Sequence, residues 1–205
     1  MRVSAPPRKA GSEGSPRTPV GYRPQVAAIP LPPRPALARP ADTLPPAGAA
    51  GHAVAYEPKW DGFRALVRHN AIWSRRGRDL RPYFPDLAAT LTTILPPDLI
   101  VDGEIVTWNP ATSRLDFAAL SGRFTAGKRI REWAANHPAQ FVAFDVLADG
   151  AEDLRPLPLI ERQVILADAL DLPGPAITLC PQTLDLTAAR DWMSEYAPAG
   201  VEGLL

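Results

Sequence analysis

Apolar residues recur at helical spacing in three parts of the chain. Leu87, Leu91 and Ile94 lie at positions i, i+4 and i+7, and Pro85 with Asp86 provides a suitable helix start. A short further helix is predicted to be capped by Asp116 and to run through Leu120. A second apolar face consists of Ile160, Val164 and Ala167. A third face, after a predicted cap at Thr187, consists of Ala189, Trp192, Met193 and Tyr196. The chain is therefore expected to contain at least four helices.

Short β-rich runs lie between these helices. Two of them are separated only by Asn70 and predict a hairpin. The runs are residues 53–56, 64–69, 71–74, 99–108, 141–147 and 177–179. Strands and helices are mixed without regular β–α–β alternation, and no internal repeat is visible. The pattern therefore favours an α+β fold over a doubly wound parallel sheet.

The N-terminal part of the chain differs in composition from the rest. Twelve of the 25 prolines fall in the first 50 residues, and residues 1–40 contain seven basic side chains against one acidic side chain. This composition offers little to bury, so residues 1–30 are expected to form a disordered tail rich in Pro and Arg. Residues 31–46 also contain leucines and are expected to form an extended arm packed on the domain. A basic tail is compatible with loose DNA contact, but a purely solubilising role is the preferred interpretation.

Length and composition limit the remaining possibilities. With 205 residues, of which 46% are hydrophobic, the chain can bury one good core, and its formal net charge is zero. Cys180 is the only cysteine, which excludes a disulfide framework and a cysteine-based zinc site. No apolar run approaches the ~18 residues that a membrane span requires, and the N-terminus lacks the apolar region of a secretory signal. A cytoplasmic protein without membrane contact is therefore expected.

Residues 57–64, with the sequence Glu-Pro-Lys-Trp-Asp-Gly-Phe-Arg, offer the clearest candidate chemistry. A free lysine, with a pKa of ~10.4, is a poor nucleophile at neutral pH, but burial and neighbouring cations lower such a pKa and free the amine to attack phosphorus. Asp61 could orient the amine of Lys59 or receive its proton, and Gly62 would let the chain turn tightly beside a nucleotide. A surface hairpin with alternating charge is the structural alternative.

This segment resembles motif I of the covalent nucleotidyltransferases, and its Glu-x-Lys-x-Asp-Gly-x-Arg form is similar to that of ATP-dependent DNA ligases. Four later segments resemble further ligase motifs in the order of that family. They are Ser-Arg-Arg-Gly-Arg-Asp-Leu at residues 74–80, Asp-Gly-Glu at 102–104, Phe144 within the run 141–147, and Gly-Val-Glu-Gly-Leu at 200–204. The first departs from the family pattern at Arg76, where asparagine is usual, and at Arg78, which replaces a lysine. Each match alone is weak, but five in order are strong.

The resemblance implies roles for the residues that match these motifs. Lys59 and Asp61 would be catalytic, with Lys59 as the nucleophile that attacks the α-phosphate of ATP. Glu57 would accept a hydrogen bond from the adenine amino group, and Phe144 would stack on the base. Arg64 would contact the ribose or the substrate end. ATP is therefore the implied cofactor.

Three further side chains would contact the metal ion or the DNA. Glu104 would contact the ribose or help to bind a divalent metal, and Glu202 would help to hold that metal. Mg²⁺ is the expected ion because its ligands are carboxylate and phosphate oxygens. Arg75 would contact the 5′-phosphate at a nick in double-stranded DNA, which is the implied partner.

The resemblance covers residues 31–205 and implies an α+β, ATP-grasp-like nucleotidyltransferase (adenylation) domain with mixed or antiparallel sheets. The family continues with motif V and a C-terminal OB-fold, and neither is found in this sequence. The chain is therefore expected to be an incomplete adenylation domain, weak or inactive in sealing nicks during DNA repair or recombination. A monomer is expected, with DNA-repair proteins as candidate partners.

Three other interpretations stay open at this point, and one of them is an unstable, inactive remnant, which a broad or absent melting transition would indicate. An RNA ligase or an mRNA-capping guanylyltransferase shares Lys-x-Asp-Gly, and a preference for ATP over GTP would separate a ligase from a capping enzyme. A non-catalytic nucleotide- or DNA-binding module would bind ATP or a nick without forming a covalent adduct.

Overall fold

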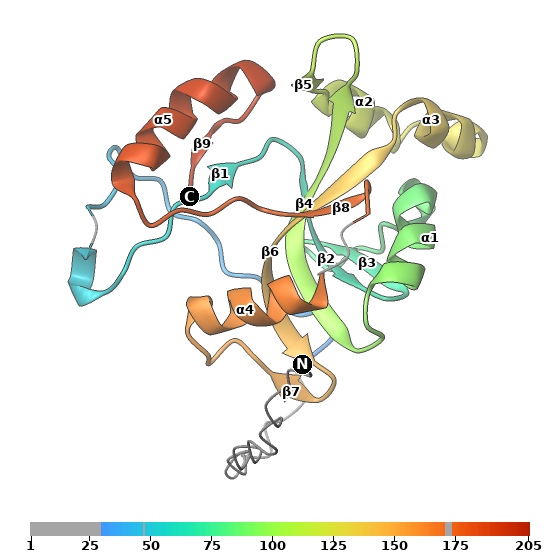
Figure 1. The fold of residues 1–205 in the computed structure, drawn as a ribbon. Helices are drawn as coiled ribbons and strands as arrows, with labels where there is room; N and C mark the ends of the chain where they lie inside the picture. The colour runs from blue at the N-terminus through green and yellow to red at the C-terminus, as the bar shows by residue number, and fades with distance from the viewer. Residues whose placement is uncertain (1–29, 47, 171–173) are drawn as a thin grey trace, which may run out of the picture.

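The centre of the fold is a seven-stranded sheet whose main path runs β3-β2-β4-β6-β7, with β5 beside β4 and β8 beside β6 (Figure 1). Its strands are β2 (Phe63–Arg68), β3 (Ala71–Ser74), β4 (Leu99–Asn109), β5 (Arg114–Leu115), β6 (Ala139–Asp149), β7 (Glu152–Asp153) and β8 (Ile177–Leu179). The β6–β8 pair is parallel and the other pairs are antiparallel. This computed structural model describes residues 30–46, 48–170 and 174–205, so the tail predicted for residues 1–30 lies outside it apart from Pro30.

A second, two-stranded sheet joins segments that are far apart in the sequence. Strand β1 (Pro58–Lys59) pairs antiparallel with β9 (Gly203–Leu204). Beyond the strand ends, the backbone of Glu57 exchanges two hydrogen bonds with that of Leu205 (2.9 and 2.8 Å). The lysine segment is therefore held by backbone pairing against residues 203–205.

Five helices surround the sheet in the described part of the chain. They are α1 (Pro85–Ile94), α2 (Phe117–Gly122), α3 (Ile130–Asn136), α4 (Leu159–Ala169) and α5 (Leu186–Tyr196), with 3₁₀ turns at Ala49–Gly51, Arg81–Tyr83, Gly127–Arg129 and Ala197–Ala199. Helices α1, α2 and α4 contact the central sheet, whereas α5 contacts β1 and β9 (Figure 1). Among the described residues, no helix combines the length and the apolar character that a membrane crossing requires.

Most of the predicted elements are present, and the α+β prediction is confirmed. The hairpin, the helix after Pro85 and the long strand at 99–108 all form as expected. The carboxylate of Asp116 caps α2 by accepting a hydrogen bond from the backbone N–H of Ala119 (2.8 Å). Leu87 and Leu91 of α1 join a buried cluster with residues of β4, β6 and α4. The apolar spacing in α1 therefore marks its buried face correctly.

Three local predictions are wrong. The apolar face expected on α4 points to solvent, with Ile160 and Val164 being 62% and 57% exposed, because Leu166 on another side of the helix fills the core. Helix α5 is capped by Asp185, whose carboxylate accepts from the N–H of Thr187 (2.7 Å). The run 53–56 forms no strand and makes a single bridge, from Tyr56 to Thr183. Local spacing cannot choose between two apolar stripes on one helix, or between two capping residues that lie two positions apart.

A buried ion pair connects the helices with the central sheet. Arg123, whose side chain is fully buried, donates two hydrogen bonds to the carboxylate of Asp86 (2.7 and 2.8 Å). Its guanidinium also donates to the backbone carbonyls of Tyr83 (3.2 Å) and His137 (2.5 Å). Asp86 in turn accepts from the N–H of Ala139 (2.9 Å), at the first residue of β6. The pair therefore fixes the start of α1, the end of α2 and the start of β6 to one another.

Removing this pair should strongly destabilise the fold. We predict that Arg123→Met lowers the free energy of unfolding by roughly 3–5 kcal/mol, because Asp86 keeps a charge without its partner. Arg155 makes a comparable two-bond contact with Asp153 but is largely exposed, so Arg155→Met should cost at most about 1 kcal/mol. Urea unfolding of both variants measures the difference, and equal losses would contradict the role given to Arg123.

Candidate active site

Seven of the eight side chains singled out in the sequence line one cavity of about 790 Å³. They are Lys59, Asp61, Arg64, Arg75, Glu104, Phe144 and Glu202. The eighth, Glu57, directly precedes Pro58, which also lines the cavity. The residues come from β1, β2, β4, β6, the loops after β1 and β3, and the position just before β9, so the fold gathers segments up to 143 positions apart.

Lys59 and Glu202 form an ion pair at the cavity. Their meeting follows from the β1–β9 pairing, since the backbone N–H of Glu202 also donates to the carbonyl of Lys59 (3.0 Å). Both side chains are about half exposed. The amine is therefore accessible from solvent, and a carboxylate holds it in position.

Gly62 allows the loop after β1 to lie directly on β4. A Cβ atom at this position would lie 2.2 Å from the carbonyl oxygen of Ile105 and 3.0 Å from Cγ of Glu104. Any other residue would push the loop away from the strand. The glycine is required here by close approach of two backbones.

Glu104 projects into the cavity from β4, opposite Arg64 of β2 in the sheet register. Burial raises the pKa of its carboxyl group to about 8, and the nearby positive charges of Arg64 and Lys59 oppose that shift only in part. Because the neighbouring positive charges do not fully compensate for its burial, the carboxylate of Glu104 favours binding a proton or a cation.

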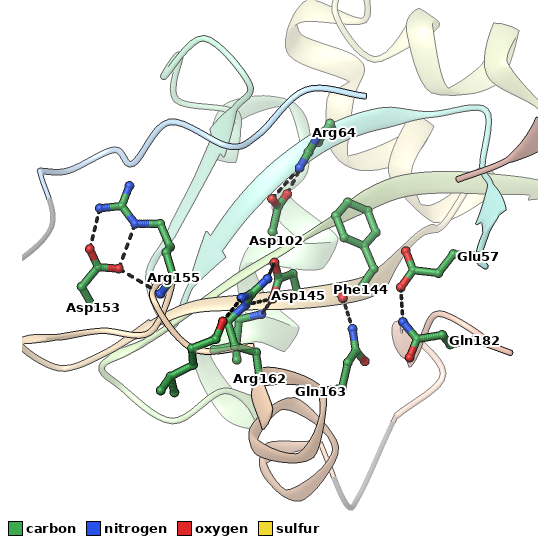
Figure 2. Close-up of polar contacts among 12 residues, drawn as sticks. Glu57, Arg64, Asp102, Phe144, Asp145, Asp153, Arg155, Arg162, Gln163 and Gln182 are labelled. Carbon is green, nitrogen blue, oxygen red and sulfur yellow. Dashed lines mark hydrogen bonds and ion pairs between the residues drawn. The ribbon is translucent and has the colours of Figure 1, made fainter. Parts of the chain in front are cut away.

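Arg64 is held by the buried carboxylate of Asp102 (Figure 2). Its Nε and Nη2 atoms donate to the two oxygens of Asp102 (3.0 and 2.7 Å), and its Nη1 donates to the carbonyl of Ala36 (2.7 Å). The guanidinium carbon lies 5.3 Å from the ring centroid of Phe144, within cation–π range. These contacts explain the buried acid in β4. They leave two N–H groups of Arg64 for a ligand, so its contact with a ribose stays a prediction.

Glu57 has a partner that sequence reasoning missed. Its carboxylate accepts a hydrogen bond from the side-chain amide of Gln182 (2.8 Å), from the loop after β8 (Figure 2). Burial raises the pKa of Glu57 to about 7, and the hydrogen bond from Gln182 partly offsets this shift. The two residues are 125 positions apart, and no local pattern in the sequence marks Gln182.

Phe144 lies between Arg64 and Glu57 in the close-up view (Figure 2). Its backbone carbonyl accepts from the side chain of Gln163, and the adjacent Asp145 pairs with Arg162 of α4 (2.7 and 2.9 Å). Helix α4 therefore fixes the strand that carries the ring.

The carboxylates of the cavity fit a divalent metal. Glu104 and Glu202 line the same space as Asp61. Within residues 30–46, 48–170 and 174–205, no three His, Cys, Asp or Glu side chains are close enough to hold a metal by themselves. Mg²⁺ commonly uses one or two carboxylates together with phosphate oxygens and water, so two glutamates beside a nucleotide would be a suitable set.

Comparison with known proteins identifies the family. Residues 35–205 match the family model described as the ATP dependent DNA ligase domain. The chain belongs to the ATP-dependent DNA ligase family. The order of the motifs in this sequence therefore reflects membership of the ligase family, and the RNA ligase and capping-enzyme alternatives are not favoured.

Curated relatives agree with this assignment. DNA ligase C2 of Mycolicibacterium smegmatis is 40% identical over 181 residues, which cover 85% of this chain and 49% of the relative. DNA ligase C of Mycobacterium tuberculosis is 38% identical over 181 residues, which cover 83% of this chain and 48% of the relative. The chain thus spans about half the length of these ligases.

Solved ligase structures share the fold. The ligase domain of LigD from M. tuberculosis superposes with a TM-score of 0.52 at 23% identity, covering 73% of this chain and 46% of that one. A mycobacterial DNA ligase D complexed with ATP and MES gives a TM-score of 0.51 at 25% identity, with the same coverage. The predicted nucleotidyltransferase type of fold is confirmed.

The raised pKa of Glu104 predicts how stability depends on pH. Because the folded chain binds this proton more tightly than the unfolded chain, the stabilising contribution is complete below pH 4.5, the ordinary pKa, and is lost as pH rises through about 8. Glu104→Gln cannot titrate, so we predict that it melts at a higher temperature than the parent at pH 8.5 and shows no such gain at pH 4. The exposed Glu132→Gln is the control, and equal behaviour of both variants in thermal melts would contradict the prediction.

Proposed function

We propose that this chain is the adenylation domain of an ATP-dependent DNA ligase and that Lys59 becomes covalently linked to AMP. The observation that carries the proposal is the convergence of seven motif side chains on a single cavity. Family membership supplies the reaction type, and the cavity provides the residues that the reaction needs.

The proposed chemistry begins with an uncharged amine on Lys59. Its nitrogen attacks the α-phosphorus of ATP, a P–N bond forms, and the bond to the bridging oxygen breaks so that pyrophosphate leaves with the electron pair. The proton lost by the amine passes to a nearby carboxylate, for which we assign Asp61. Glu202 pairs with Lys59 in the free chain and would turn to the metal when nucleotide binds, which releases the amine.

The other cavity residues would position the nucleotide. Glu57 would accept from the adenine amino group, Phe144 would stack on the base, and Arg64 would contact the ribose or the substrate end. Glu104 would contact the ribose or hold Mg²⁺ together with Glu202. When bound, Mg²⁺ would neutralise negative charge on the phosphates.

Nicked double-stranded DNA is the proposed substrate of the later steps. The adenylate would pass to the 5′-phosphate, contacted by Arg75, and the 3′-hydroxyl would then displace AMP and seal the strand. These two steps are proposed from family membership, whereas adenylation is also supported by the cavity itself. We further propose that the protein acts as a monomer in DNA repair or recombination, alongside repair partner proteins.

Covalent labelling tests the nucleophile. With Mg²⁺ and ATP labelled at the α-phosphate, we predict that the denatured chain retains label and that Lys59→Ala abolishes it. Lys128→Ala, on the exposed 3₁₀ turn before α3, should label like the parent. Label that persists in Lys59→Ala would refute the assignment. ATP binding without label in the folded parent would support the non-catalytic alternative instead.

The hydrogen bond between Gln182 and Glu57 predicts a pH-dependent affinity for ATP. Gln182→Leu removes a stabilising donor, so the pKa of Glu57 should rise above about 7 and the protonated carboxyl should lose its role as acceptor. We predict binding weakened by roughly 10-fold at pH 7, as expected for one hydrogen bond to a charged group, with recovery at pH 9. Calorimetric titration with ATP measures this effect. Gln140→Leu serves as the control, and equal loss at both pH values would contradict the explanation.

A further inference from the structure

A second groove, of about 630 Å³, lies beside the candidate active site and has no part in the proposed adenylation. It lies between the proline-rich arm of residues 30–46 and the loop after β3. Three arginines line it: Arg34 on the arm, and Arg75 and Arg76 on the loop. Leu37, Arg75 and Arg76 also line the cavity that contains Lys59, so the groove is continuous with it.

The arm is fixed to the domain at three points. At its start, Gly77 has a φ of +83°, and a Cβ atom at that glycine would lie 2.8 Å from Cγ of Pro32, so the arm packs directly on the loop. Further on, the carbonyl of Ala36 accepts from Arg64, and the carbonyl of Pro45 accepts from the hydroxyl of Tyr56 (2.6 Å). The prolines also restrict φ along the arm, which reduces the entropy lost when a ligand binds. Arg34 is therefore held over the groove by a preorganised segment.

The charge of the groove is of one sign. Among the residues that the structure describes, no acidic side chain lines it. Arg34, Arg75 and Arg76 are exposed, and within the part of the chain that the structure describes no hydrogen bond or ion pair engages their side chains. By contrast, Arg64 and Arg123 are each paired with a carboxylate. Three unpaired guanidinium groups around a concave surface favour an oxyanion, and their planar donors suit phosphate.

We infer that this groove binds the phosphodiester backbone of the DNA strand at the nick, with Arg34 of the arm and Arg76 as contacts additional to Arg75. The inference rests on the proposed function for the identity of the strand. The phosphates of ATP are the other source of the same chemistry, but they must reach Lys59, and Arg34 does not line the cavity where Lys59 lies. A strand whose 5′-phosphate lies at Arg75 would continue into the groove.

DNA binding as a function of salt tests the inference. We expect Arg34→Ala to weaken binding of a fluorescently labelled nicked duplex several-fold at 50 mM salt. The slope of log K against log salt should become shallower by about 0.9, the change expected for one lost phosphate contact. Arg39→Ala is the matched control, because Arg39 lies on the same arm, is exposed and does not line the groove. Equal effects of the two substitutions, or no measurable binding by the parent at low salt, would overturn the inference.

A second variant tests whether DNA binding depends on the position of the arm as well as on its charge. Gly77→Ala would be strained at a φ of +83° and would collide with Pro32, so it should displace the arm. We expect it to reduce DNA affinity although no charge is removed. Affinity at the parent value in Gly77→Ala would overturn the view that the arm must be held in place.

Lysine adenylation distinguishes failure of this inference from failure of the proposed function. Arg34→Ala should form the lysyl-AMP adduct at the parent rate and with an unchanged KM for ATP. A raised KM with unchanged DNA binding would assign the groove to the phosphates of ATP and overturn the inference. If the parent itself formed no adduct, the proposed adenylation would fail, whereas the salt dependence would still decide whether the groove binds DNA.

Discussion

The ion pair between Arg64 and Asp102 is the interaction on which the candidate site depends most. Asp102 is almost fully buried, and both of its oxygens are used by Arg64. The same guanidinium holds the arm through Ala36 and lies against the ring of Phe144. One side chain thus connects β2, β4, β6 and the arm, and a buried charge left without its partner would disturb all four. The proposed nucleotide cavity and the arginine groove are therefore built on a common support.

Much of the fold could be predicted from the sequence because its signals are local. The hairpin has two β-rich runs around Asn70, and α1 has both a start signal and a single apolar stripe. The motif residues were also found from sequence alone, since their order along the chain resembles a known family. Apolar spacing gave the wrong face for α4, where Leu166 enters the core and Val164 does not. Two apolar stripes on one helix are equivalent until the position of the sheet is known.

What the sequence could not provide are partners that the fold brings together from distant positions. The contact of Gln182 with Glu57 is of this kind, because a glutamine in a loop has no distinctive pattern. The anchoring of the arm is a second example, because the backbone carbonyl of Ala36, rather than a side chain, accepts the hydrogen bond from Arg64. The packed arm was expected from its leucines, but the meeting of Arg34 and Arg75 in one groove depends on how Pro32 packs against Gly77. The number of charges along the sequence does not show which arginines line a common groove.

The pairing of β1 with β9 has a consequence for the order in which the site is assembled. Each strand has only two residues, and the contact between Lys59 and Glu202 closes a loop of 143 positions. Bringing together residues so far apart in the sequence costs conformational entropy of the chain, and two such short strands form only a few hydrogen bonds to offset that cost. Contacts of this kind form late in folding and are among the first to open in native-state fluctuations. Lys59, the proposed nucleophile, therefore lies on a pairing that is expected to open readily, whereas Phe144, the residue proposed to stack on the base, lies on the long strand β6 of the central sheet.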